Sequence, residues 1–173
     1  VIHGFGEHSR RYLHMISAFL DAGYIVAADD HVGHGKTAMV NEVWGDWGDK
    51  GPHTMMEDEH TLKGIVCEKY PDLPYFLFGH SMGSMLTRRY IQLYGDDLVG
   101  AVLSGSGVFS NGLLKLGTVV AASEIKRNGR AHPSLLLDKL VFQNFNRGFK
   151  PARTDLDWLS RDEAEVDKFL KDP

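Results

Sequence analysis

The stretch that decides the fold is Gly79-His80-Ser81-Met82-Gly83, which reads G-x-S-x-G. In this pattern, a sharp turn between a strand and a helix exposes a serine hydroxyl to a base and a substrate. Small residues on both sides of the serine let neighbouring backbone come close, which explains Gly79 and Gly83. We therefore interpret Ser81 as a nucleophile. The alternative is a turn of small residues without a chemical role.

The sequence on both sides of this turn is consistent with a strand and a helix. The short apolar run Pro74-Tyr75-Phe76-Leu77-Phe78 precedes it and predicts a buried strand. Apolar residues then recur at helical spacing up to Gly95, which predicts the end of a helix. These residues are Met82, Met85, Leu86, Tyr90 and Leu93. Another apolar strand is expected over residues 98–103.

A second glycine-rich motif, His3-Gly4-Phe5-Gly6, follows the apolar pair Val1-Ile2. A strand that ends in H-G-x-G can present a backbone N–H group to an oxyanion. We therefore expect an oxyanion hole formed by the N–H groups of Phe5 and Met82. The residues expected to support the loop and the turn are His3, Gly4, Gly79, His80 and Gly83. The alternative is a glycine turn with a structural histidine.

Strands and helices alternate up to residue 107, which predicts a mostly parallel sheet with helices on both faces. Helices are expected over 10–22, where Gly23 follows, and from a capping box at 54–57 to about residue 70. The buried face of the second helix is expected to consist of Leu62, Ile65 and Val66. Residues 24–28 predict a parallel strand, and residues 41–53 an irregular surface loop.

The polar segment Asp29–Thr37 comes directly after the expected strand 24–28. Its Gly-Lys-Thr end is similar to a phosphate-binding loop, but Asp30 stands where that motif needs a glycine. His31 and His34 lie near two aspartates, yet the cysteines of a structural zinc site are absent. We therefore expect no metal, and we interpret the segment as a polar loop that braces the site.

Residues 108–173 show helical periodicity and no convincing strand, so we expect a helical cap after a partial core over residues 1–107. Its two apolar stripes are Leu113, Leu116 and Val120, and then Leu137, Leu140, Val141 and Phe145. A second capping box at 160–163 predicts a helix through Leu170. The stripe 113–120 is expected to pack inward or to line an apolar tunnel. The alternative is transient contact with a membrane surface.

Composition narrows the class of protein. The sequence has 173 residues, of which 43% are hydrophobic, and a net charge of −4, so it fits one soluble domain and does not indicate a nucleic-acid partner. Cys67 is the only cysteine, which excludes an intrachain disulfide. No apolar run has the length of a membrane span. A cytoplasmic location is expected. The sequence begins with Val1 in what resembles a strand already under way, which predicts missing N-terminal residues.

Four segments together, HGFGEHSRRY, DDHVGHGKT, FGHSMGS and DWLSRDEAEV, resemble the monoacylglycerol lipase and lysophospholipase family of α/β hydrolases. The resemblance covers essentially the whole chain. It implies the α/β-hydrolase fold with a helical cap, and a serine esterase that cleaves single-acyl lipid esters without metal or organic cofactor. It also implies Ser81 as nucleophile and an oxyanion hole at Phe5 and Met82. Two positions depart from the family pattern: Val32 replaces a common arginine, and Ser84 replaces the last glycine of GHSMGG.

The sequence shows no base for Ser81. In this fold the acid and the histidine follow the serine in chain order. His132 is the only histidine after Ser81, and it lies in the helical region without a preceding strand, so we do not assign it as the base. The sequence is thus expected to be a fragment, incomplete at both ends. Two alternatives stay open: a peptidase or thioesterase on the same fold, and a domain that binds a ligand without catalysis. The oligomeric state is left open.

Overall fold

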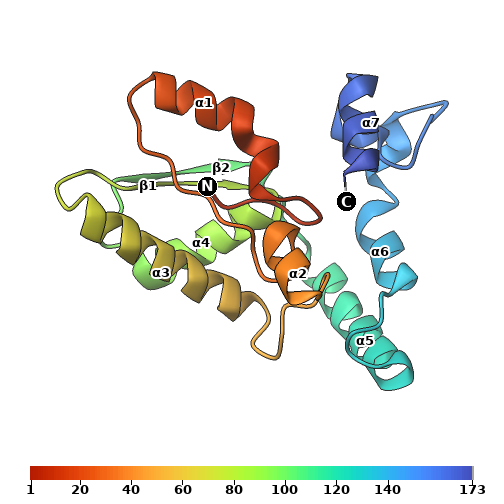
Figure 1. The fold of residues 1–173 in the computed structure, drawn as a ribbon. Coiled ribbons are helices and arrows are strands. Elements are labelled where there is room, and N and C mark those ends of the chain that lie inside the picture. The colour runs from red at the N-terminus through yellow and green to blue at the C-terminus, as the bar shows by residue number, and fades with distance from the viewer. Residues whose placement is uncertain (173) are drawn as a thin grey trace. The chain divides into compact units, whose positions relative to one another are not determined.

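The computed structural model describes residues 1–172, and the chain divides into two compact units, Val1–Val108 and Phe109–Pro173. Figure 1 shows the strands and α1 to α4 in the first unit, which we call the N-terminal unit. The second, which we call the C-terminal unit, consists of helices and loops over its described residues.

Two parallel strands, β1 (Phe76–His80) and β2 (Gly100–Ser104), form the sheet of the N-terminal unit, with Phe76 opposite Gly100. On the other side of β1, Ile2 makes a parallel bridge to Gly79. The Ile2 N–H donates to the Phe78 carbonyl at 2.8 Å, and the His80 N–H donates to the Ile2 carbonyl at 3.1 Å. Because β1 has partners on both sides, it is the central strand of this part of the sheet.

Helices lie on both sides of these strands: in Figure 1, α1 is on one side and α3 and α4 are on the other. The helices of the N-terminal unit are the 3₁₀ turn η1 (Ser9–Tyr12), α1 (Leu13–Asp21), α2 (Gly35–Asn41), α3 (Pro52–Lys69) and α4 (Met82–Tyr94). This arrangement of helices around a parallel sheet is the α/β architecture expected from the sequence.

The hydrophobic core lies where α3 and α4 pack against β1. Its buried residues are Ile2, Met55, Met56, Leu77, Leu86 and Tyr90. Val32, one of the two positions that depart from the resemblance, packs against this core and is partly buried. The core therefore joins the first residues of the chain to the strand and the helix that flank Ser81.

Three details of the secondary structure differ from the sequence-based expectations. Residues 24–28 form no strand, because the backbone bonds found there do not build a ladder: the Val1 nitrogen donates to the Ala27 carbonyl at 2.7 Å, and the Tyr24 N–H donates to the Phe19 carbonyl at 2.9 Å. Helix α3 begins at Pro52 rather than at the capping box, because a proline suits the first helical position, where an N–H has no partner. Its buried face consists of Met55, Met56, Glu59 and Lys63, not of Leu62, Ile65 and Val66.

The irregular loop expected over residues 41–53 also begins later than predicted, because residues 35–41 form the short helix α2. Both strands lie one or two residues further along the chain than the apolar runs that predicted them, as is common at element ends. Strand β1 consequently reaches His80, directly before Ser81.

The C-terminal unit contains helices α5 (Asn111–Asn128), α6 (Leu135–Phe142) and α7 (Glu163–Lys171), with 3₁₀ turns η2 (Phe145–Gly148) and η3 (Asp157–Leu159). Side chains cap all three α-helices. Ser110 and Ser134 accept N–H groups of α5 and α6, and Asp162 accepts the Ala164 N–H of α7. The expected capping box at Ser160 is therefore wrong by two residues, since Asp162 is the N-cap.

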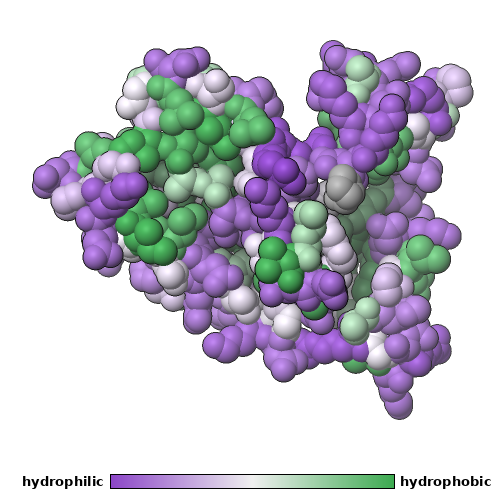
Figure 2. Space-filling model, in the orientation of Figure 1, coloured by the Kyte–Doolittle hydropathy of each residue, from purple (hydrophilic) through white to green (hydrophobic). Residues whose placement is uncertain are grey.

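Many apolar side chains of both units lie at the surface, as the green areas of Figure 2 show. In α5 the stripe residues Leu113 and Leu116 are 36% and 51% exposed. Val166 is the one buried hydrophobic residue among positions 109–172. None of the helices over residues 1–172 combines the length and the apolar character that a membrane crossing requires.

Candidate functional site

Ser81 occupies a sharp turn between β1 and α4. Its backbone has φ 53° and ψ −117°, a region that non-glycine residues rarely adopt, and it is the N-cap of α4. The Ser81 N–H donates to the Ser104 carbonyl at the end of β2 at 2.9 Å. Ser81 thus stands at the carboxyl ends of two parallel strands, where open α/β sheets bind ligands.

The two glycines of the motif are required by close packing. A Cβ atom on Gly83 would overlap the carbonyl oxygen of Ile2, and one on Gly79 would overlap the Thr87 hydroxyl. Both neighbours are fixed, since the first is backbone and the second donates to the Gly83 carbonyl at 2.8 Å. The turn therefore admits no side chain at either position.

The loop after Ile2 runs directly beside Ser81. A Cβ atom on Gly4 would lie 3.1 Å from the Ser81 Cβ and 2.5 Å from Glu7 Oε1. The expected oxyanion donors follow directly: Phe5 is the next residue after Gly4, and Met82 is the first residue of α4. The first N–H groups of a helix have no intrahelical acceptor, and they carry the positive end of the helix dipole. The loop and the turn thus bring the two predicted halves of the site together.

Glu7 holds the loop in shape. Its Oε1 atom accepts the Gly4 N–H and the Tyr12 hydroxyl, each at 2.5 Å. Its Oε2 atom lies 3.7 Å from the Arg11 guanidinium. Burial, followed by the bond to Glu7, raises the pKa of Tyr12, so the phenol stays a proton donor. A single carboxylate therefore links the N-terminal loop to the start of the first helical segment.

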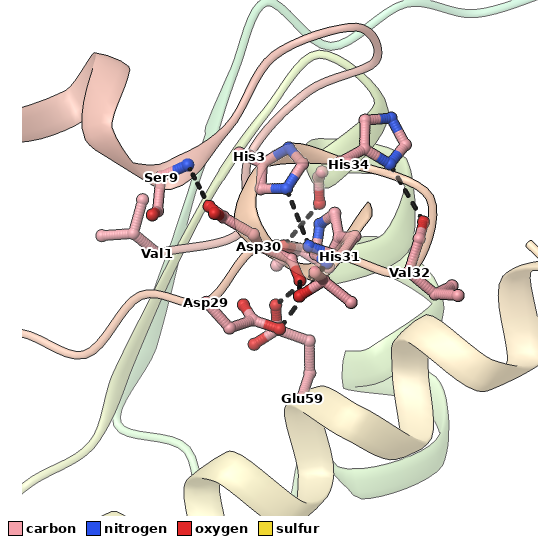
Figure 3. A network of polar contacts seen from close by, with 12 residues as sticks. Val1, His3, Ser9, Asp29, Asp30, His31, Val32, His34 and Glu59 are labelled. Carbon is pink, nitrogen blue, oxygen red and sulfur yellow. Dashed lines mark hydrogen bonds and ion pairs between the residues drawn. The ribbon is translucent and has the colours of Figure 1, made fainter. Parts of the chain in front are cut away.

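His3 is fully buried and bonded through both ring nitrogens, as Figure 3 shows in part. Nδ1 is 2.8 Å from the Gly4 carbonyl, and Nε2 accepts the His31 N–H at 3.0 Å. These two partners assign the ring hydrogen to Nδ1. Burial, and next the neighbouring charge of His31, lower the pKa of His3 to about 4, so the ring is neutral at pH 7. His3 thus fixes Gly4 from the side opposite Glu7.

Segment 29–37 supports the same loop. Asp30 Oδ1 accepts the Ser9 N–H at 2.8 Å, and Oδ2 accepts the Lys36 N–H at 2.8 Å. Its backbone carbonyl accepts the Thr37 hydroxyl at 2.6 Å. Together with the bond from His31 to His3, these contacts hold the segment in the supporting position that its polar composition suggested.

The residue at position 84 also fits the turn. Ser84 is fully buried, and its hydroxyl donates to the Ser81 carbonyl at 2.6 Å. The extra hydroxyl relative to the GHSMGG pattern is therefore satisfied within the first turn of α4. Beside the turn, His80 Nδ1 lies 3.1 Å from the Ser104 hydroxyl, which orients the ring at the end of β1.

Over residues 1–172 the structure records no hydrogen bond to the Ser81 hydroxyl. His132 lies exposed in the loop between α5 and α6, and His80 is bonded to Ser104. The described residues therefore bring the expected nucleophile Ser81 beside the loop of the expected backbone donors, without a base in contact with the Ser81 hydroxyl.

Sequence reasoning did not identify Glu7, Tyr12 or Glu59 as parts of the site or its support, and it placed Asp30 in the supporting segment without a role of its own. The sequence does indicate the helical face of Glu59, because this residue lies three positions after Met56 and so on the same side of the helix. The roles of Glu7 and Asp30 depend on which backbone N–H groups the folded loop turns toward them. A sequence pattern does not show that orientation.

Comparisons with known proteins agree with this arrangement. Residues 1–173 match the family described as serine aminopeptidase, S33. A solved carboxyl esterase from Bacillus coagulans, in complex with glycerol, has a TM-score of 0.91 and 49% sequence identity. That comparison covers 99% of this chain and 55% of the esterase chain.

Two curated relatives carry lipase names. Monoacylglycerol lipase of Mycolicibacterium smegmatis is 30% identical over 99% of this chain and 53% of its own length. Human monoglyceride lipase is 31% identical over 100% of this chain and 50% of its own length. The chain thus spans about half the length of these relatives, and the resemblance found in its four motifs is confirmed. From the family match over residues 1–173, the chain belongs to the serine aminopeptidase S33 family and has the α/β-hydrolase fold.

Proposed function

We propose that the protein containing this chain is a serine hydrolase that cleaves carboxylic esters of single-acyl lipids, of the monoacylglycerol or lysophospholipid type. The observation that carries the proposal is the contact between Gly4 and Ser81, which sets an N–H-bearing loop beside a strained serine at a helix N-terminus. The lipase and esterase names of the relatives support the choice of an ester as substrate.

In the proposed reaction the Ser81 hydroxyl attacks the ester carbonyl carbon, and the bond to the alcohol breaks to leave an acyl-serine. Water then releases the fatty acid. The Phe5 and Met82 N–H groups stabilise the negative charge on the carbonyl oxygen, and each such donor is worth about 10²-fold or more in rate. The relatives are about twice as long as this chain, so we place the general base, a histidine, in sequence that they have beyond it.

The C-terminal unit is proposed to be the cap that receives the acyl chain. Its support is the set of apolar side chains that α5 and α6 expose, which include Leu116 at 51% and Leu135 at 77%. An apolar acyl chain would be transferred out of water by such a surface. Transient contact of the same side chains with a membrane surface, and action in the cytoplasm, belong to this proposal.

The proposal is tested by intact mass before and after a fluorophosphonate probe, on the protein that includes this chain and its triad partners. One adduct is expected, lost in Ser81→Ala and retained in Ser17→Ala, which changes an exposed serine on α1. An adduct that persists in Ser81→Ala contradicts the nucleophile assignment. A complete protein that takes no adduct, yet binds lipid, supports a non-catalytic binding domain instead.

A peptidase is the second candidate, because the matched family is described as a serine aminopeptidase. The same serine and oxyanion donors can act on amides, since a fold does not determine the substrate. A panel of monoacylglycerols, lysophospholipids, aryl esters and aminoacyl amides separates the two candidates. Turnover of the amides alone would replace the lipase proposal with the peptidase.

A further inference from the structure

Three side chains that could bind a cation meet on the α3 side of the loop that supports the site. Asp29 and His31 come from segment 29–37, and Glu59 comes from α3 (Figure 3). One ligand atom from each lies within 4.8 Å of the others. His31 Nδ1 is 3.8 Å from Asp29 Oδ2 and also 3.8 Å from Glu59 Oε1. The cluster is thus assembled from two segments that are distant in sequence.

Two of the three side chains are buried, Asp29 is partly buried, and several polar atoms of the cluster have no partner. The His31 and Glu59 side chains are 0% and 2% exposed. Within the described residues, both ring nitrogens of His31, Glu59 Oε1 and Asp29 Oδ1 have no hydrogen-bond partner. A buried polar atom without a partner costs about 1–3 kcal/mol, and a buried charge costs more. A ligand bound between these atoms would supply the partners that they lack.

The spacing suits a metal ion better than a direct hydrogen bond. A separation of 3.8 Å exceeds hydrogen-bond length. Two ligands at about 2.1 Å from a tetrahedral zinc ion are roughly 3.4 Å apart, so a small inward movement would complete the coordination.

The two carboxylates of the cluster also favour a cation at this position. The Asp29 and Glu59 carboxylates both lie 3.8 Å from His31 Nδ1, and two carboxylates that share one site repel each other when both are ionised. A divalent ion would neutralise the two carboxylates together and complete the partners of His31 Nδ1.

We propose that Asp29, His31 and Glu59 bind one Zn²⁺ ion, His31 through Nδ1 and each carboxylate through one oxygen, with water in the fourth position. This differs from the expectation of no metal, which considered His31 and His34 without the buried Glu59. The ion would be structural. The His31 N–H is bonded to His3 Nε2, and His3 Nδ1 to the Gly4 carbonyl, so fixing His31 stiffens the loop beside Ser81.

The test uses the chain itself and needs no turnover, so it is independent of the proposed hydrolysis. Chain freed of metal with EDTA is titrated with Zn²⁺ in a calorimeter, and thermal unfolding is followed with and without the ion. We expect one site per chain and a Tm that rises by several degrees at a hundredfold excess over the Kd. Mg²⁺, which prefers oxygen ligands, should raise the Tm far less at equal concentration.

Two variants of α3 make the test specific. Glu59→Gln should weaken zinc binding at least 100-fold, while the metal-free variant is as stable as the metal-free parent, because it removes a buried charge. Glu57→Gln, at an exposed position of the same helix, should change the affinity less than twofold. A Tm that does not respond to Zn²⁺, or an equal rise in Glu59→Gln, would overturn the proposal.

Discussion

Polar side chains around Ser81 are buried and bonded to backbone groups, whereas the polar side chains that make comparable bonds in the C-terminal unit are partly buried or exposed. His3 and Ser84 are fully buried, and each is bonded to the backbone of the loop or the turn. In the C-terminal unit, the Asp157 carboxylate accepts the Thr154 hydroxyl at 2.6 Å and two backbone N–H groups, but Asp157 is only partly buried. The two units therefore differ in how tightly the surrounding residues hold each polar side chain.

This difference is consistent with a division of labour in the proposed hydrolase. A reacting centre must hold donors and nucleophile within fractions of an ångström, so its backbone is fixed by several contacts at once. A surface that receives a flexible acyl chain requires apolar area rather than one fixed geometry. The glycines show the contrast most directly: Gly83 has no space for a Cβ atom, whereas Gly117 in α5 has no atom within 4 Å of one.

The largest effect is expected from this pair of glycines. Gly83→Ala should lower the free energy of unfolding by roughly 2–4 kcal/mol, since the new methyl group overlaps the Ile2 carbonyl. Gly117→Ala should raise it by about 0.5–1 kcal/mol, because alanine favours an open helical position. Urea unfolding followed by circular dichroism measures both. Similar effects of the two substitutions would show that packing does not distinguish the units.

Gly4→Ala should affect chemistry more than stability. Its methyl group would crowd Glu7 Oε1 and the Ser81 Cβ, so the loop must move away from the proposed oxyanion position. We expect fluorophosphonate labelling of Ser81 in the complete protein to slow by about 10²-fold, as for the loss of one oxyanion donor. Gly64→Ala, at an open position of α3, is the control. Unchanged labelling of Gly4→Ala would exclude this loop from the oxyanion hole.

Glu7→Gln tests whether the carboxylate positions the loop. The amide replaces an ionised acceptor of the Gly4 N–H by a weaker neutral one, so labelling of Ser81 should slow by about tenfold. Tyr12→Phe leaves that bond in place and should have a smaller effect. The matched change in the C-terminal unit is Asp157→Asn, which should leave labelling unchanged and lower the Tm slightly. Slower labelling in Asp157→Asn would remove the distinction between the units.

The smallest effect concerns the start of α7. Asp162→Ala removes the side chain that accepts the Ala164 N–H at 2.9 Å and should cost about 1 kcal/mol, a typical value for an N-cap. Ser160→Ala should cost less, since Ser160 accepts the Asp162 N–H outside the helix. Amide hydrogen exchange over residues 163–166 reports this directly. A larger loss of protection in Ser160→Ala than in Asp162→Ala would instead support Ser160 as the N-cap, as the sequence suggested.

The elements around Ser81 were predictable because their signals are local. A strand, a G-x-S-x-G turn and a helix follow one another along the chain, and the structure has them as β1, Ser81 and α4. Helix ends marked by one strong residue, such as Gly95 after α4, were also readable. Element boundaries were less so: Pro52 determined the start of α3 against a capping-box pattern three residues later.

The sequence by itself thus determined the order of strand, sharp turn and helix around Ser81 and the glycines of the loop after Ile2, because each depends on neighbours within a few positions. Tertiary structure alone decided that Gly4 lies beside Ser81 with no space for a Cβ atom, that Glu7 turns toward the Gly4 N–H, and that Glu59 is buried beside His31. These contacts join residues that are distant in the chain. Their energies come from burial and from close approach of backbone groups, which no local pattern records.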